Sequence, residues 1–399
     1  MKFDITIIGA GIVGLATAYK LLEQNPKLKV CVVEKETKIA QHQTGHNSGV
    51  IHSGIYYKPN SLKAINCQKG YQQLIDFCEK YDVKYDLCGK VIVATKEEER
   101  KSLDNIYKRG VENGLAGIKK ITPHEVKEIE PYVHCVEGVW VPQTGIVDYK
   151  DVSVKYLELI QLKGVVVYLG EKVLKIQTSK ETTLVITDKQ EIATKAVVNC
   201  CGLYSDKVAK LTNNEIDLQI IPFRGEYYEL KKEKEYLVKN LIYPVPNPDF
   251  PFLGVHYTRM IHGGIEAGPN AVLAFKREGY SRWDINIKEL YETLTFSGFQ
   301  KVASKYWDEG WSEMKRSYSK RLFVKALQVL IPEIQYEDVV RSGAGVRAQA
   351  CDAQGNLLDD FSIIENNNII NVCNAPSPAA TSSLAIGDTI ASMVIQRLN

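Results

Sequence analysis

Three glycines near the N-terminus have a spacing that suits the phosphates of a nucleotide. Gly9, Gly11 and Gly14 form the pattern G-x-G-x-x-G, after a short apolar run and before an apolar pattern with helical spacing. Gly9 permits a tight turn out of the strand, Gly11 lets a pyrophosphate approach the backbone, and Gly14 lets the helix pack closely. The free N–H groups of the first helical residues, Ile12 and Val13, would then face the phosphates. The pattern predicts a dinucleotide-binding strand, turn and helix.

An acidic residue follows at the distance expected for recognition of a ribose. A second β-rich run, residues 29–34, ends in Glu34, about 20 residues after Gly14. The Glu34 carboxylate would accept hydrogen bonds from ribose hydroxyls and would repel a 2′-phosphate, which disfavours NADP. The neighbouring Lys35 belongs to the same expected site. The fingerprint alone fits NAD as well as FAD, and its place at the N-terminus favours FAD. A tight strand–helix turn without a ligand is the alternative.

The segment 43–57 (QTGHNSGVIHSGIYY) combines small residues with two histidines and two tyrosines. Small residues let a flat cofactor lie against the backbone, and the polar side chains can face it. An ordinary glycine- and serine-rich loop with a hydrogen-bonded histidine explains these residues equally well. The candidate cofactor contacts in this segment are Thr44, Gly45, Asn47 and Ser48.

The composition is that of an ordinary globular protein. The chain has 399 residues, 45% hydrophobic and 25% charged, which suggests two domains or one large one. Its 50 basic and 48 acidic residues leave a formal net charge of +2, so we expect no nucleic-acid partner. Nine cysteines without zinc-type spacing indicate a reduced compartment and predict no metal site. No signal peptide or membrane-spanning run is apparent, so we expect a cytoplasmic protein.

Longer motifs carry a resemblance to a known family. The run QTGHNSGVIHSGIYYKP is followed by motifs at residues 144–149 (TGIVDY), 222–228 (PFRGEYY), 252–259 (FLGVHYTR), 268–271 (GPNA), 345–349 (GVRAQ) and 374–383 (NAPSPAATSS). Together they resemble the signature of the L-2-hydroxyglutarate dehydrogenase/oxidase family, within the larger group similar to D-amino-acid oxidase and glycerol-3-phosphate dehydrogenase. The resemblance covers nearly the whole chain.

This resemblance implies an α/β fold. In such proteins a Rossmann-like FAD-binding domain is interleaved with an α+β substrate domain built on a mixed, mainly antiparallel sheet. The FAD-binding domain would comprise residues 1–85, 149–215 and 336–399, and the substrate domain residues 86–148 and 216–335. FAD is the implied cofactor. The implied substrate is an L-2-hydroxy acid, with the dicarboxylate L-2-hydroxyglutarate as the first candidate.

Further cofactor contacts follow from the same resemblance. Val173 lies where relatives meet the adenine through their backbone, and Cys201 and Gly202 end a buried strand that closes over FAD in relatives. The small and hydroxyl residues near the C-terminus precede a helical pattern whose positive end would point at the flavin N1–C2 edge. Simple capping of that helix is the alternative. The contacts expected in this run are Ser377, Pro378, Ala379, Ala380 and Thr381.

Oxidation of a 2-hydroxy acid needs a base for the hydroxyl proton. Histidine suits this role because its ordinary pKa lies near neutrality. Among seven histidines, His52 and His256 lie inside the family motifs, and we expect His52 to be the base and His256 to be the second candidate. A core histidine bonded to backbone is the alternative for either. His46 lies in an H-x-x-G context that carries covalent FAD in some distant relatives, which leaves a covalent link open.

The substrate carboxylates need positive partners. Arginine grips a carboxylate with a planar fork, so Arg347 is the leading anchor. Arg259 and Arg224 are further candidates for the distal carboxylate, and Tyr257 could donate its hydroxyl. A structural salt bridge is the alternative for each arginine.

The reduced flavin must pass two electrons to oxygen, a quinone or an electron-transfer protein, and the sequence leaves this choice open. Apolar and aromatic residues with helical spacing from Phe296 to Trp311, followed by basic residues up to Lys325, would suit an anionic membrane surface. Packing on a neighbouring sheet is the alternative. Docking would place the protein on the inner face of the cell membrane and make quinone the expected acceptor.

Two other functions fit the same motifs. One is a related flavoenzyme that acts on an amino acid or on glycerol 3-phosphate. The other is a flavin-containing assembly subunit without turnover. Reduction of the bound flavin by substrate separates an enzyme from such a subunit.

Overall fold

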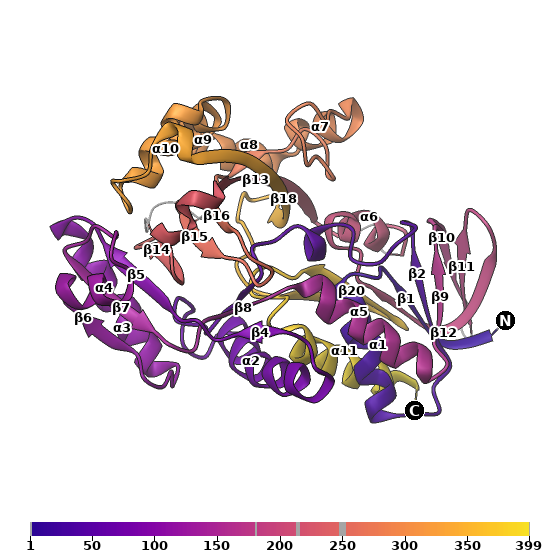
Figure 1. Ribbon diagram of the computed structural model, residues 1–399. Helices are drawn as coiled ribbons and strands as arrows, with labels where there is room; N and C mark the ends of the chain where they lie inside the picture. Colours follow the sequence, from indigo (N-terminus) through magenta and orange to yellow (C-terminus); the bar gives the residue numbers. More distant parts are fainter. Residues whose placement is uncertain (1, 180–181, 213–215, 247–252, 399) are drawn as a thin grey trace.

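Two β-sheets dominate the computed structural model, which describes residues 2–179, 182–212, 216–246 and 253–398. Phe252, the first residue of one quoted motif, lies outside these ranges. The first sheet and its helices lie with both chain termini at the right of Figure 1, and the second sheet lies to the left, below a group of helices.

The first sheet has eight strands and a parallel centre. The parallel strands follow the spatial order β20 (Ile369–Asn374), β12 (Glu191–Asn199), β1 (Lys2–Ile8), β2 (Val30–Glu34) and β9 (Val166–Leu169). The antiparallel strands are β10 (Val173–Thr178), β11 (Thr183–Thr187) and β19 (Ser362–Asn366). The central strands are almost continuously apolar because protein covers both faces of this sheet.

Helices cover one face of this sheet (Figure 1). They are α1 (Ile12–Gln24), α5 (Tyr149–Leu162) and α11 (Ser383–Leu398), and α2 (Leu62–Tyr81) packs beside α11. Apolar side chains of all four helices share one core with β1 and β2. α1 and α11 approach closely at Gly387, where a Cβ would lie 2.9 Å from the backbone of Ala16. This core holds in place the loops that follow β1 and β2.

The second sheet has nine strands and is mainly antiparallel, although β5 and β14 run parallel. Its order is β17 (Val272–Leu273), β13 (Leu218–Leu230), β16 (Ile265–Gly268), β15 (His256–Arg259), β14 (Leu241–Pro244), β5 (Lys90–Ala94), β7 (Glu137–Val141) and β6 (Lys119–Ile121), and β18 (Val339–Asp352) also pairs with β13. A small third sheet joins β3 (Val50–Ile51), β8 (Gly145–Val147) and β4 (Tyr85–Asp86).

Two groups of helices flank the second sheet (Figure 1). The first group is α3 (Arg100–Glu112) and α4 (Pro123–Ile129). The second group is α7 (Ile287–Thr295), α8 (Ser297–Lys305), α9 (Trp307–Tyr318) and α10 (Lys320–Gln328). A short helix, α6 (Ser205–Ala209), follows β12 in the first half.

This architecture confirms the predicted fold class of a parallel α/β sheet interleaved with a mixed, mainly antiparallel sheet. One predicted boundary is wrong. The range 336–399 places β18 in the dinucleotide half, but β18 pairs with β13 from Leu218 to Leu230 in the second sheet. The physical reason is that strand pairing between distant segments depends on the tertiary fold. The local sequence of β18 does not show which sheet it joins.

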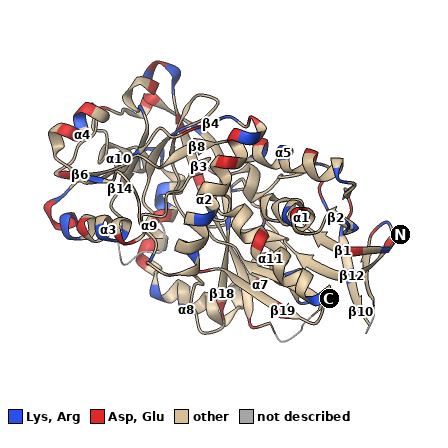
Figure 2. Ribbon diagram, turned by 90° about the horizontal axis from the view of Figure 1, so that it is seen from below, with Lys and Arg blue, Asp and Glu red and all other residues tan. Residues whose placement is uncertain are grey.

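The aromatic segment predicted to dock on a membrane divides into two parts. Three aromatic residues before Trp307 pack around Val302 against β13 and β18. Trp307 and Trp311 on α9 stay exposed, at 67% and 55%. No helix in the described ranges combines the length and apolar character that a membrane span requires. Seen from below, acidic and basic residues are interspersed on the helices, in line with the small net charge (Figure 2).

Alanine substitutions at two helical glycines, one packed between α1 and α11 and one in open space on α9, should have opposite effects on stability. Gly387→Ala should lower stability by about 1–3 kcal/mol because the new methyl group has no room against Ala16. Gly310→Ala on α9, where nothing lies within 4 Å of the new Cβ, should raise stability by about 0.5–1 kcal/mol. Thermal unfolding of the two variants checks both directions, and a stabilised Gly387→Ala would contradict the packing described.

Candidate active site

One large cavity has walls from both halves of the molecule and a volume of about 850 Å³. The first half contributes the glycine loop after β1, the end of β2, the start of β10 and the segment before α11. The second sheet contributes parts of β13, β14, β15 and β18. The residues predicted to bind the cofactor that line this cavity are Gly9, Gly11, Ile12, Val13, Glu34, Lys35, Thr44, Asn47, Ser48, Val173, Cys201, Gly202, Ser377, Pro378, Ala379, Ala380 and Thr381.

The glycine loop leaves no room for side chains. Gly9 has φ +104°, and a Cβ there would lie 2.6 Å from the carbonyl oxygen of Cys200. A Cβ on Gly14 would lie 2.1 Å from the carbonyl oxygen of Gly9. Gly14 therefore acts by letting α1 pack against the loop, and it does not itself line the cavity. Gly45 is also outside the wall, because it packs against the Ala40 carbonyl oxygen, 2.3 Å from a Cβ position.

The N-terminus of α1 opens on the cavity. Its N-cap, Gly11, has no side chain to cap it, and its first turn carries no acidic residue. The N–H of Ile12 donates to Thr44 Oγ1 at 3.0 Å, which ties the segment 43–57 to this helix end. Unpaired N–H groups and the helix dipole favour negative charge here.

The acid at the end of β2 is held by backbone N–H groups. Glu34 Oε2 accepts from Ala10 at 2.8 Å and Glu34 Oε1 accepts from Glu36 at 2.9 Å. The carboxylate therefore has a fixed orientation at the cavity wall. Asn47, in contrast, is turned onto its own loop, where its amide donates to the Thr44 carbonyl at 2.6 Å.

His52 lies between the segment 43–57 and the segment before α11. Its Nε2 is 3.3 Å from Ser377 Oγ, and its backbone N–H donates to Thr381 Oγ1 at 3.1 Å. Burial, and after it the positive charge of Lys90, lowers the pKa of His52 to about 3. The ring is therefore neutral at physiological pH, and the same burial makes it a weaker base than an exposed histidine.

His256 stands on β15 with its orientation fixed from two sides. Its Nδ1 is 2.9 Å from the carbonyl oxygen of Gly254, and its ring lies 4.0 Å from the ring of Tyr243. A carbonyl only accepts, so Nδ1 carries the proton and Nε2 is left as an acceptor. Burial lowers the pKa of His256 to about 3, although the bond to Gly254 opposes this shift.

Arg347 lines the cavity from β18, where it is partly buried. Its Nη1 donates to the Asn270 carbonyl at 3.4 Å. Burial lowers the pKa of the guanidinium, and arginine nevertheless stays charged in proteins. This cation therefore faces the space in which a carboxylate would bind.

Two of the predicted substrate contacts point away from the cavity. Tyr257 follows His256 in β15, and side chains alternate along a strand, so Tyr257 faces the opposite core. Its hydroxyl donates to the Leu327 carbonyl at 3.1 Å. Arg259 does not line the cavity and forms an ion pair with Asp86. The prediction for these two residues is therefore wrong.

Arg224 does not line the cavity either, contrary to the prediction. It is 3% exposed and forms an ion pair with Glu226 at 3.1 Å. Along β13 the cavity is lined by Gly225 and Tyr227 instead. Sequence reasoning missed Tyr227, and alternation along β13 would have found it once one cavity-facing residue of that strand was known.

Comparison with known proteins agrees with this geometry. A family model described as FAD dependent oxidoreductase matches residues 4–393. The chain belongs to this family. Within it, the chain is 58% identical over 398 residues to an L-2-hydroxyglutarate dehydrogenase from Indibacter alkaliphilus, with 100% of both chains covered. It is 46% identical to the mitochondrial L-2-hydroxyglutarate dehydrogenase of Homo sapiens, with 99% of this chain and 89% of the human protein covered. The predicted family resemblance is confirmed.

Solved structures show the same fold. A dithionite-reduced L-alpha-glycerophosphate oxidase from Mycoplasma pneumoniae with FAD bound superposes with a TM-score of 0.81, at 24% identity, over 100% of this chain and 95% of that one. Glycine oxidase from Geobacillus kaustophilus superposes with a TM-score of 0.74, at 15% identity, over 99% and 95% of the two chains.

The cavity of this FAD-dependent oxidoreductase fits its cofactor. The glycine loop leaves no room for side chains where the pyrophosphate would approach, and the first turn of α1 presents N–H groups without an acidic residue. The Glu34 carboxylate, which lies at the sequence spacing typical of a ribose-binding acid, is fixed at the cavity wall by the Ala10 N–H. The residues before α11 complete the wall on the side of His52. FAD is the cofactor that these features and the family support.

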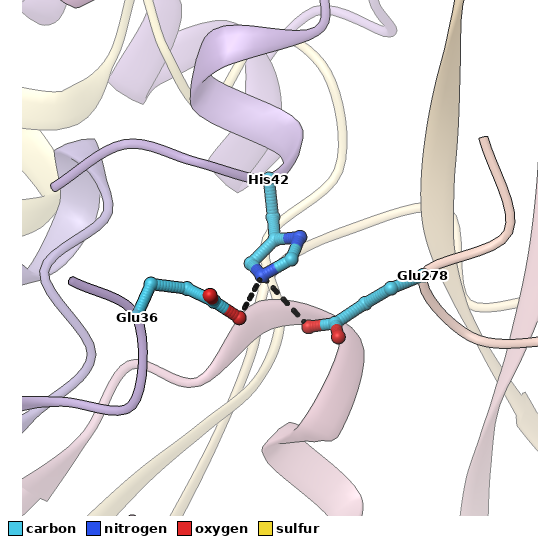
Figure 3. A group of neighbouring side chains, drawn as sticks. All are labelled: Glu36, His42 and Glu278. Carbon is cyan, nitrogen blue, oxygen red and sulfur yellow. Dashed lines mark hydrogen bonds and ion pairs between the residues drawn. The ribbon is translucent and has the colours of Figure 1, made fainter. Parts of the chain in front are cut away.

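Near Glu34, an ion-pair cluster joins the two halves across the cavity wall (Figure 3). His42 Nε2 lies 3.0 Å from Glu36 Oε1 and 2.9 Å from Glu278 Oε1. Lys35 Nζ lies 2.7 Å from the same oxygen of Glu278 and also contacts Glu36. Because Lys35 already places positive charge between the carboxylates, this group is a salt-bridge network. Glu278 and His42 were not predicted, since only the fold brings them together.

This cluster predicts a pH-dependent stability. Burial opposes charge on His42, but Glu278 and Glu36 raise its pKa above the ordinary 6.5. The contribution of His42 is therefore full below pH 6.5 and is lost as the pH rises through the raised pKa. His42→Gln should lower the thermal midpoint more at about pH 5.5 than at about pH 8.5. Exposed His124→Gln is the matched control, and an equal loss at both pH values would contradict the prediction.

Proposed function

We propose that this protein oxidises L-2-hydroxyglutarate to 2-oxoglutarate. The observation that carries the proposal is the 58% identity, over the full length of both chains, to an L-2-hydroxyglutarate dehydrogenase. The cavity supports it chemically, because it combines a carboxylate-binding arginine with two neutral histidines beside the predicted flavin site.

The residues divide the work of the reaction. When bound, FAD accepts the hydride from C2 of the substrate. Arg347 binds the carboxylate next to C2 and so orients the carbon. His52 takes the hydroxyl proton, and His256, with Nε2 as an acceptor, is the second candidate for that proton. Arg347 is partly buried, so its interaction with a carboxylate would be stronger than in bulk water.

Anaerobic mixing with L-2-hydroxyglutarate tests the function. The yellow flavin absorbance should bleach, whereas D-2-hydroxyglutarate, lactate and glycerol 3-phosphate should bleach it far more slowly. His52→Gln should slow bleaching by about 10²–10⁴-fold while the protein stays yellow, as expected for loss of a general base. A parallel His256→Gln variant assigns the base if His52→Gln retains the normal rate. Protein that keeps its colour with L-2-hydroxyglutarate would overturn the proposal.

The same experiment has a defined pH dependence. Burial lowers the pKa of both histidines to about 3, so their proton-accepting form is already complete at pH 5 and above. The bleaching rate should therefore not fall as the pH drops from about 7 to about 5. A rate that halves near the ordinary histidine pKa of 6.5 would assign the proton to a less buried group.

We further propose that the protein works at the cytoplasmic face of an anionic membrane and passes its electrons to quinone. The support is the exposed apolar surface of α7 and α9, where Ile287 is 82%, Tyr291 68% and Trp307 67% exposed, next to basic residues such as Lys315. Oxygen and an electron-transfer protein are the other acceptors consistent with the chemistry.

Vesicle binding checks the membrane proposal. The protein should cosediment with phosphatidylserine-containing vesicles at low salt and much less with pure phosphatidylcholine. Trp307→Ser combined with Trp311→Ser should reduce the bound fraction several-fold because these rings supply the buried apolar area. Protein that stays wholly in the supernatant at low salt contradicts docking and favours a soluble acceptor.

A further inference from the structure

Lys90 places a positive charge inside an apolar wall next to the active-site cavity. It is the first residue of β5, and alternation puts its side chain on the same face as Ile92 and Ala94, which belong to a hydrophobic cluster. Lys90 is only 1% exposed. A strand position of this kind ordinarily carries an apolar residue, because burial of an unpaired ammonium group is strongly unfavourable.

No negative group in the described ranges offsets this charge. The close neighbours of the Lys90 ammonium are the rings of Tyr56 and Tyr243, whose centroids lie 4.6 and 4.8 Å away, and no carboxylate or other acceptor among the described residues contacts it. The Tyr56 hydroxyl is likewise buried without a hydrogen-bond partner in those ranges. Two neighbouring donors, one of them cationic, therefore lack an acceptor. An anion with oxygen acceptors would satisfy both.

The Lys90 charge acts on the part of the cavity that holds the histidines. Tyr243, His52 and His256 line the cavity, and the Tyr243 ring lies 4.0 Å from the His256 ring. Lys90 and Tyr56 are not lining residues; Lys90 stands behind this wall, with its ammonium 4.8 Å from the centroid of the lining Tyr243 ring. The positive charge of Lys90 contributes to the low pKa of both histidines, and Arg347 contributes to that of His256. The reacting end of the cavity thus lies under the influence of two cations on different strands.

We propose that Lys90, assisted by the Tyr56 hydroxyl, selects the distal carboxylate of a five-carbon dicarboxylate while Arg347 binds the carboxylate beside C2. This inference rests on the proposed function, since only a diacid brings the second negative charge. Lys90 is a specificity-determining residue in this role, because it does not touch the reacting atoms.

Three other cations in this part of the molecule are already paired with carboxylates. Arg259 pairs with Asp86 and Arg224 pairs with Glu226. Lys63 lines the cavity but pairs with Asp359 at 2.8 Å. Lys90 differs from these three because no described residue supplies a counter-charge to it.

The titration of Lys90 fits this role. Burial lowers the pKa of Lys90 to about 7. Of the titratable groups facing it, burial holds His52 and His256 neutral and raises the pKa values of Cys67, Tyr56 and Tyr243. A carboxylate beside Lys90 stabilises the charged form, so binding of a diacid should weaken as the pH rises above 7.

Calorimetric titration of the FAD-loaded protein tests the proposal without turnover. Glutarate carries both carboxylates, and pentanoate has the same carbon chain without the second one. In Lys90→Met the dissociation constant for glutarate should rise about 100-fold, whereas that for pentanoate should change by less than about 3-fold. The variant should stay yellow, with a thermal midpoint equal to or above that of the wild type, because a buried unpaired charge has been removed. Tyr56→Phe should weaken glutarate alone, by about 5–10-fold.

Lys63→Met is the matched control, and it should alter the two ligands by the same factor. Unchanged glutarate binding in Lys90→Met would overturn the proposal, and so would equal weakening of both ligands with a lower thermal midpoint, which indicates a purely structural lysine. Selective loss of glutarate in Lys63→Met instead would also overturn it. Wild-type protein that binds glutarate tightly but is not reduced by L-2-hydroxyglutarate would overturn the proposed oxidation and leave the carboxylate subsite standing.

Discussion

Burial of ionisable side chains between the two sheets is the constraint that governs this site. Burial penalises charge, and it lowers the pKa of His52 and His256 to about 3 and that of Lys90 to about 7. The same burial keeps both imidazoles neutral and makes each a weaker base than an exposed histidine. It also makes a buried cation without a counter-charge costly.

The cavity exists because both halves of the molecule contribute its walls. The first sheet supplies the glycine loop and Glu34, and the second supplies His256 and Arg347. The loop after β17 returns to the first half twice, through the buried pair of Arg277 and Asp206 at 2.6 Å and through Glu278. Interleaving of the chain thus serves the chemistry, since neither sheet encloses the reacting groups by itself.

The parts of the fold that local physics controls could be predicted from the sequence. The strand, glycine turn and helix that became β1 and α1 depend on apolar runs and on glycines without room for a Cβ, and both are visible in the sequence. The family motifs located His52, His256 and Arg347, and all three line the cavity.

The parts that depend on distant segments could not be predicted. Neighbouring residues of a strand face opposite ways, so the motif holding His256 also contains Tyr257, which points into the core, and nothing local says which faces the cavity. By residue type alone, Arg224 and Arg259 suit a carboxylate ligand. Their ion-pair partners, Glu226 and Asp86, cannot be recognised from the sequence, so the sequence does not show that these charges are already paired. Lys90 could not be singled out for the converse reason. In the sequence a lysine is ordinary, and it becomes informative only through its burial without a carboxylate partner among the described residues.

The two cations proposed for the substrate differ in a way that suits their positions. Arginine keeps its charge even where burial lowers its pKa, so Arg347 can orient the reacting carbon at any physiological pH. A buried lysine gains and loses its proton readily, so Lys90 becomes fully charged when the distal carboxylate arrives. Discrimination against a monocarboxylate then arises from the cost of leaving the Lys90 ammonium unmatched in an apolar wall. The Lys90 ammonium is already buried without a described counter-charge before the substrate binds, and only a ligand with a second carboxylate relieves this unfavourable state.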